Sequence, residues 1–172
     1  ANSGGPPEVR ARLDLLTPIA KAWCTEVAFD VTSLGVQIHG GFGYSEESAA
    51  SQYFREARAH MIYEGTTGVQ ANDLIFRKIL RDDGAAAKTL IACILRDVAE
   101  GESGGRLEIR RASRELRSAV SELAGLVDWL CTCSPVNDAQ NLQANGAHFL
   151  MLFGACAAGW LSLRSALFAS AG

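Results

Sequence analysis

The sequence predicts an all-α protein, because apolar residues recur at spacings of three and four and no strand-like alternation persists. Six long amphipathic helices with short connections are expected, which favours an up-and-down helical bundle. Of the 172 residues 48% are hydrophobic and 20% charged, the balance of a soluble globular protein with a core. The net charge of −3 provides no basic footprint, so we expect no nucleic-acid partner.

The first helix is long and is expected to end at a glycine-rich segment, residues 40–44. Pro18 interrupts its pattern early, so the first turn should be separate or kinked. Its apolar positions at helical spacing predict a buried face made of Leu13, Leu16, Ala20, Trp23, Val27, Val31, Leu34 and Ile38.

Two further helices complete the first half. One is expected from about Ser48 to Met61, and the next starts after Gly65 and closes at residues 82–84. At its start, Thr67 and Gln70 have the spacing of a capping box, in which each side chain satisfies a free amide of the first turn. Its buried side is expected to consist of Leu74, Ile75 and Ile79.

The second half contains helices over residues 85–100 and 106–133, a linker by composition at residues 101–105, and a last helix after a break at residues 134–135. The apolar run Phe149 to Leu163 in that last helix has only 15 residues. Because a membrane span needs about 20 residues, we expect a buried core helix and no membrane span.

The two halves of the sequence differ in their residue patterns, which predicts two structural units. Residues 1–84 are expected to form part of one helical bundle, and residues 85–172 an appended helical module. The five cysteines are scattered without a CxxC pair, and the histidines share no ligand spacing, so no metal site is assigned. Cysteines in apolar helical patterns indicate a reducing compartment, the cytoplasm or an organelle matrix, and we expect a cytoplasmic protein.

Two segments carry candidate chemistry. Residues 37–44 hold three glycines in four positions, which let a backbone approach a ligand closely and turn its amides toward an anion. The alternative interpretation is structural, because a helix that ends in a turn also needs glycine. Residues 62–67 form a connection that contains Glu64, although a lone acidic residue in a loop is usually a solvated surface group.

Together with a motif between them, these segments follow a fixed order: Gln37-x-x-Gly40-Gly41-x-Gly43-Tyr44, Arg55-x-x-Arg58 and Ile62-Tyr63-Glu64-Gly65-Thr66. This order resembles the C-terminal helical domain of acyl-CoA dehydrogenases. The second half, which contains the motif Gly159-Trp160-Leu161, is similar to an extra helical module in the methylmercaptopropionyl-CoA dehydrogenase subgroup. The resemblance implies a truncated chain that lacks the N-terminal helical domain, the middle β-domain and the first helices of the bundle.

The resemblance also implies oxidation of the Cα–Cβ bond of an acyl-CoA thioester to trans-2-enoyl-CoA, with FAD as cofactor. Glu64 matches the base that removes a Cα proton while the β-hydrogen leaves as hydride to the flavin, although some relatives carry the base on an earlier helix. The neighbours Tyr63 and Gly65 are expected to line the substrate. Burial beside an apolar acyl chain makes a carboxylate a stronger base.

The cofactor contacts implied by the resemblance fall in both segments. Gln37, Gly40 and Gly41 match a stretch that reaches the FAD of a neighbouring subunit, and Thr66 matches a threonine that touches the subunit's own FAD. The chain departs from the pattern at Gly68, where some members place a polar flavin contact.

Partners follow from the same resemblance: an acyl-CoA substrate, an electron-transferring flavoprotein as acceptor, and further copies of the chain in a homo-oligomer. The isolated chain is expected neither to retain FAD nor to turn over substrate. An alternative is a non-catalytic assembly module that packs subunits and covers a cofactor held by other domains. A third is a bundle that binds an acidic partner through the arginines of residues 110–117, which are more often a solvated helix face.

Overall fold

The computed structural model describes residues 5–104, 106–132 and 135–170. Helices make up nearly all of these ranges and no strand occurs within them, which confirms the predicted all-α fold. In chain order the elements are α1 (Pro7–Ile38), α2 (Gly40–Tyr44), α3 (Ala49–Ile62), α4 (Thr67–Asn72), the π-helix η1 (Asp73–Ile79), the 3₁₀-helix η2 (Leu80–Asp82), α5 (Ala85–Ser103), α6 (Leu107–Thr132) and α7 (Pro135–Ser170).

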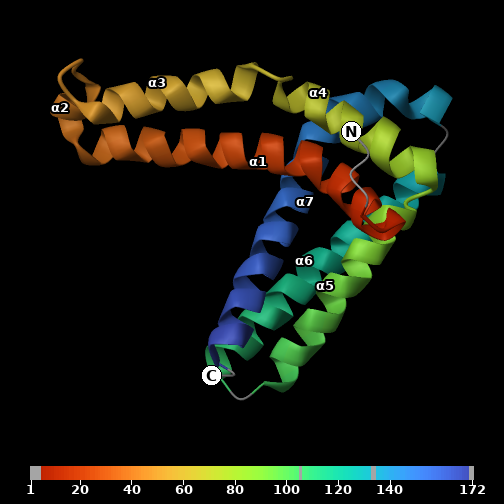
Figure 1. The fold of residues 1–172 in the computed structure, drawn as a ribbon. Coiled ribbons are helices and arrows are strands. Elements are labelled where there is room, and N and C mark those ends of the chain that lie inside the picture. The colour runs from red at the N-terminus through yellow and green to blue at the C-terminus, as the bar shows by residue number, and fades with distance from the viewer. Residues whose placement is uncertain (1–4, 105, 133–134, 171–172) are drawn as a thin grey trace.

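The molecule has two arms that meet at α4 and the first part of α7 (Figure 1). In one arm α1 and α3 run side by side, with α2 at the tip that joins them. In the other, α5, α6 and α7 pack against one another. Because α7 also contacts α1 and α4, the last helix ties the two halves of the sequence together.

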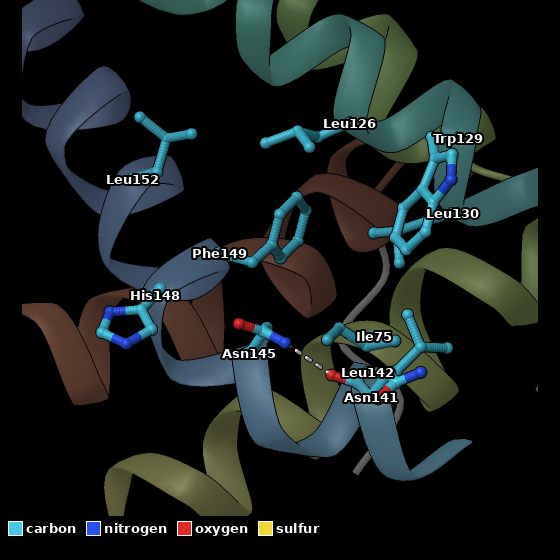
Figure 2. Close-up of a pocket in the computed structure, with 10 residues that line it drawn as sticks. All are labelled: Ile75, Leu126, Trp129, Leu130, Asn141, Leu142, Asn145, His148, Phe149 and Leu152. Carbon is cyan, nitrogen blue, oxygen red and sulfur yellow. Dashed lines mark hydrogen bonds between the residues drawn. The ribbon is translucent and has the colours of Figure 1, made fainter. Parts of the chain in front are cut away.

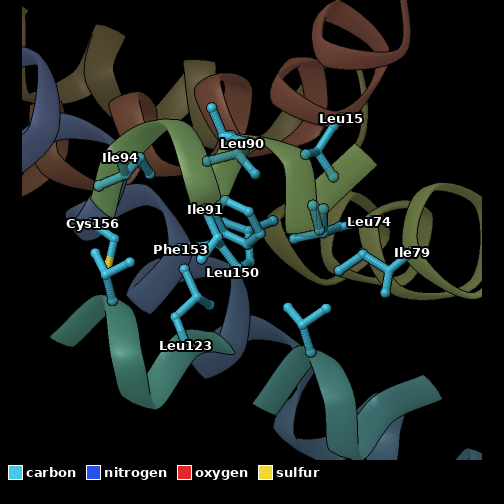
Figure 3. Close-up of a cluster of buried hydrophobic side chains, with 14 of the residues drawn as sticks. Leu15, Leu74, Ile79, Leu90, Ile91, Ile94, Leu123, Leu150, Phe153 and Cys156 are labelled. Carbon is cyan, nitrogen blue, oxygen red and sulfur yellow. The ribbon is translucent and has the colours of Figure 1, made fainter. Parts of the chain in front are cut away.

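One hydrophobic core spans both halves of the chain. Leu15 and Leu74 from the first half are buried in the same cluster as Leu90, Leu123 and Phe153 from the second (Figure 3). The predicted buried positions of η1, Leu74, Ile75 and Ile79, are confirmed, since each is at most 1% exposed. The two units expected from the sequence therefore share a continuous core.

The predicted buried face of α1 is wrong, since none of its eight positions is buried. Leu16, Trp23 and Val27 are half-buried, whereas Leu13 and Ile38 are 67% and 82% exposed. The residues of α1 that are buried are Leu15, Pro18, Ile19 and Ala22. The C-terminal part of α1 lies in the arm, where α2 and α3 are its main neighbours, so apolar spacing alone overestimated its burial. The helix is continuous through Pro18, but its N-terminal part is inclined to the rest, as expected where proline removes a backbone donor (Figure 1).

The connection predicted at residues 82–84 is confirmed. Asp83 and Gly84 adopt left-handed conformations with φ of 55° and 75°, and the Asp82 carboxylate accepts a hydrogen bond from the Ala86 amide at 3.0 Å. The π-helical turn that precedes it was not expected from the spacing of the apolar residues. Each hydrogen-bonded loop of a π-helix contains one residue more than a loop of an α-helix, and such turns are rare.

The linker expected at residues 101–105 is wrong in its first part, because α5 continues to Ser103. Gly101 is buried, and a Cβ there would lie 2.2 Å from the Ser113 Oγ. This glycine therefore permits close contact between α5 and α6. Gly105 and the predicted helix end at Cys133 lie outside the described residues.

Helix α7 is longer than the apolar run suggested. Over Ala139–Ser170 it is long and apolar enough to cross a membrane by length and composition, and 44% of its most apolar window is buried within the protein. Leu150, Phe153 and Cys156 lie in the common core, and burial raises the pKa of the Cys156 thiol. These contacts agree with the expected core helix, since core helices of soluble proteins pass the same test.

Candidate functional site

The connection between α3 and α4 carries Glu64 in an unusual conformation. Glu64 has a φ of 56° and the following Gly65 a φ of 93°, so two consecutive residues lie in the left-handed region. For a residue with a side chain this conformation costs about 1–2 kcal/mol. The Glu64 side chain is exposed, and its backbone amide donates to no group in the described part of the chain.

Side chains hold this connection in place from two helices. Lys21 of α1 donates to the Gly65 carbonyl, and Gln70 of α4 donates to the Glu64 carbonyl at 2.9 Å. The Thr67 hydroxyl donates to the Glu26 carboxylate, also on α1. Lys21 and Glu26 are half-buried and form no ion pair within the described residues. Neither residue was predicted from the sequence. Charged residues inside a largely apolar helix were the signal that could have indicated these contacts.

These contacts correct the predicted capping box. The residue that precedes the first turn of α4 is Thr66, not Thr67, and its side chain makes no capping hydrogen bond. Thr67 and Gln70 instead bind groups outside that turn. The spacing was right for a cap, but contacts from α1 and the turn at Glu64 took both side chains.

Tyr63 and Thr66, on either side of Glu64, differ in their contacts. The Tyr63 hydroxyl lies 3.0 Å from Nδ1 of His60, one turn back on α3, and the two rings are 5.4 Å apart. Thr66 is exposed, and its hydroxyl makes no hydrogen bond within the described ranges. Thr66 can therefore bind a ligand without losing an internal contact.

The glycine-rich segment ends α1 as expected and then forms the short helix α2. A Cβ at Gly43 would lie 2.6 Å from the Val36 carbonyl oxygen, so Gly43 is required by packing. At Gly40 and Gly41, by contrast, an added Cβ would meet nothing within 4 Å, and Gly40 has a φ of 61°. Gly40 and Gly41 thus leave backbone open to a ligand.

A hollow of about 440 Å³ lies between α1, α2 and the start of α3, and neither Gly40 nor Gly41 lines it. Its walls include the rings of Phe42, Tyr53 and His39, and Nδ1 of His39 lies 2.8 Å from the Gly35 carbonyl. Gln37 is exposed at the end of α1. Glu47 also lines this hollow.

The two candidate segments do not meet in one chain. The glycine segment precedes α3 and the Glu64 connection follows it, so the 14 residues of this helix, about 21 Å at its rise per residue, separate them (Figure 1). The two candidate half-sites, the glycine segment and the Glu64 connection, therefore lie at opposite ends of α3.

A further hollow of about 360 Å³ lies between α6, η1 and α7 (Figure 2). Leu126, Trp129 and Phe149 give it an apolar wall, and the Asn145 side chain donates to the Asn141 carbonyl at 3.0 Å. None of the predicted site residues lines this hollow. Within the described residues no group of three His, Cys, Asp or Glu side chains is placed to hold a metal ion.

The fold agrees with comparisons against known families. Residues 4–79 match the family model described as "Acyl-CoA dehydrogenase, C-terminal domain". Residues 87–172 match the model described as "Acetyl-CoA dehydrogenase C-terminal like". Together the two matches cover nearly the whole chain. The chain belongs to the acyl-CoA dehydrogenase family.

Individual relatives extend this assignment. The chain is 43% identical over 171 residues to 3-methylmercaptopropionyl-CoA dehydrogenase of Ruegeria pomeroyi, covering 97% of this chain and 29% of that protein. It is 34% identical over 161 residues to the broad-specificity linear acyl-CoA dehydrogenase FadE5 of Mycobacterium tuberculosis, covering 92% and 26%. The CarC subunit of the caffeyl-CoA reductase-Etf complex of Acetobacterium woodii is 40% identical over 52 residues, 30% of this chain and 14% of that protein. The chain spans less than a third of the length of each of these relatives.

Proposed function

We propose that this chain is the C-terminal part of an FAD-dependent dehydrogenase in which Glu64 removes the Cα proton of an acyl-CoA thioester and the flavin takes up the β-hydride. The observation that carries the proposal is the Glu64 connection. An exposed carboxylate sits on a left-handed turn that hydrogen bonds from α1 and α4 hold in place. Strained backbone that its surroundings maintain is concentrated at functional sites.

The groups around Glu64 suit proton abstraction beside a thioester. The free amide of Glu64 can donate to the thioester oxygen, which stabilises the negative charge that develops as the Cα proton leaves. The free Thr66 hydroxyl is available to the subunit's own FAD, and Tyr63 and Gly65 flank the substrate. The apolar cover that would exclude water from the exposed carboxylate has to come from other parts of the assembled enzyme.

The second half-site supports a homo-oligomer. Gln37, Gly40 and Gly41 lie at the far end of α3 from Glu64, so one chain would contact its own FAD with one segment and a neighbour's FAD with the other. An electron-transferring flavoprotein is the proposed acceptor, supported by the relative named as a subunit of an Etf complex. We propose a cytoplasmic location, which the cysteines in apolar helical patterns support.

The test is flavin bleaching by a panel of acyl-CoA thioesters in the full-length protein, comparing the wild type with Glu64→Gln. The amide keeps the shape of the side chain but cannot accept the proton. We expect the variant to retain FAD and bind acyl-CoA, yet to bleach at least about a thousandfold more slowly, a loss of about 4 kcal/mol of transition-state stabilisation.

The matched control is Glu108→Gln, which changes an exposed glutamate on α6 that forms no ion pair in the described chain. It should bleach at the wild-type rate. If Glu64→Gln also bleaches at that rate, the base lies elsewhere and the chain supplies scaffold and cofactor contacts only, as in the assembly-module alternative.

A further inference from the structure

The backbone at Glu64 and Gly65 needs an external restraint. Two consecutive left-handed residues are disfavoured when the first carries a side chain, so an isolated loop would relax to other conformations. A Cβ at Gly65 would also lie 3.1 Å from Nε2 of Gln70 and 3.2 Å from Cγ1 of Val69. The start of α4 therefore packs closely against the turn, and the turn has little room to move in that direction.

Lys21 supplies the restraint from the opposite helix. Its ammonium group, 44 positions away in the sequence, donates to the carbonyl of Gly65. Lys21 is half-buried and makes no ion pair in the described chain, so its charge is directed at this one backbone oxygen. Hydrogen bonds from a charged donor are stronger than neutral ones.

A second hydrogen bond acts on the adjacent peptide. Gln70 donates to the carbonyl of Glu64, so both carbonyls of the left-handed pair are bound by side chains from different helices. The contact between Thr67 and Glu26 fixes the next residues to α1 as well. Together these contacts define the orientation of both peptide planes, and hence the direction in which the Glu64 side chain leaves the backbone.

We propose that Lys21 is a positioning residue for the carboxylate of Glu64: it holds the turn at Gly65 so that the base points at the Cα proton of the substrate. This inference rests on the proposed function of Glu64. Lys21 takes no proton and touches no substrate. Its effect on the reaction is geometric, and misplacement of a reacting group by about 1 Å can cost about 100-fold in rate.

The experiment compares Lys21→Met and Lys21→Arg in the full-length flavoprotein, with Lys88→Met as the matched control on an exposed lysine of α5. For Lys21→Met we expect FAD content and acyl-CoA affinity within about twofold of wild type, but flavin bleaching at saturating substrate slower by about 100-fold. Lys21→Arg, which still donates to the carbonyl, should restore most of the rate. A purely structural lysine would instead lower FAD content and affinity together.

Bleaching by Lys21→Met within twofold of wild type overturns the inference. If that variant does not accumulate as a flavoprotein, Lys21→Gln, whose shorter side chain withdraws the ammonium donor from the Gly65 carbonyl, takes its place, and bleaching within twofold of wild type there overturns the inference equally. The Glu64→Gln experiment distinguishes a failure of Glu64 as the base from a failure of Lys21 as the positioning residue. An active Glu64→Gln defeats the proposed function, whereas an inactive Glu64→Gln with a fully active Lys21→Met defeats only the role of Lys21.

Discussion

At the scale of single residues, glycines that look alike in the sequence have different tasks. Gly43 is required for packing, since any side chain would meet the Val36 carbonyl, while Gly41 faces open space with an ordinary backbone conformation. Nothing in the described part of the chain therefore explains a glycine at position 41. A ligand that approaches the backbone there would explain it, because glycine permits the closest approach.

This difference gives a direct test of the proposed cofactor contact at Gly41. We expect Gly41→Leu to leave the melting temperature of the chain unchanged or slightly raised, because leucine favours helix more than glycine does and an added Cβ there meets no neighbour. In the full-length protein the same change should lower FAD content, measured by flavin absorbance per subunit. Gly125→Leu, at an exposed glycine of α6 that also has free space around it, should not. Equal FAD content in both variants would remove Gly41 from the site.

At the scale of helices, periodicity and glycine positions predicted most of the elements and their ends. The start of α3 after Ser48 and the end of the third helix at Asp83 and Gly84 are local properties of the sequence, and they were predicted correctly. Burial along α1 and the contacts of Thr67 were not, because they depend on which helix lies opposite. Local spacing cannot distinguish a capping side chain from one that binds another helix.

The contact between α1 and α7 shows why glycine is needed at position 154. A Cβ there would lie 2.2 Å from Cδ1 of the Trp23 ring. We expect Gly154→Ala to lower the free energy of unfolding by about 1–3 kcal/mol, as is typical of overpacked cores, in urea titrations followed by tryptophan fluorescence. Gly125→Ala, with nothing nearby, should stabilise the chain by up to about 1 kcal/mol. An unchanged stability of Gly154→Ala would show that the Trp23 ring moves aside without cost.

Arg117, inside α6, donates two hydrogen bonds at 2.8 and 2.7 Å to Glu102 at the end of α5. These bonds hold the pKa of Glu102 below its ordinary value. Because the folded-state pKa is lowered, this contribution to stability is present above the ordinary carboxyl range and is lost as the pH falls through the folded pKa. We expect Arg117→Met to return the pKa of Glu102 to that range in an NMR titration of the carboxyl carbon.

The control for this titration is Arg111→Met, which breaks only the exposed pair of Arg111 with Glu115. It should leave the titration of Glu102 unchanged. A lowered pKa that persists in Arg117→Met would assign the effect to another group. The pairing of these two arginines also favours the solvated-face interpretation of the arginine stripe over binding of an acidic partner.

At the scale of the whole molecule, the sequence predicted the two candidate segments and the helix that separates them, and the path of α3 agrees with that separation (Figure 1). The sequence did not indicate which residues of α1 contact the Glu64 connection. Lys21 could not be predicted, since its contact with Gly65 joins residues 44 positions apart. Function that depends on distant segments, or on other subunits, requires the three-dimensional structure.

The arm of α1 and α3 predicts self-association. Only Ser51 and Ala57 of α3 are buried, and the arm exposes Val31, Leu34, Ile38, Phe42 and Tyr53, each at least 59% accessible. Apolar patches of this kind mark interfaces. We expect the chain to form dimers or larger oligomers in light scattering coupled to size-exclusion chromatography, and the double variant Leu34→Lys with Ile38→Lys to shift it toward monomer. Leu161→Lys, at an exposed position of α7, should not change the mass. A monomeric wild type would contradict this prediction.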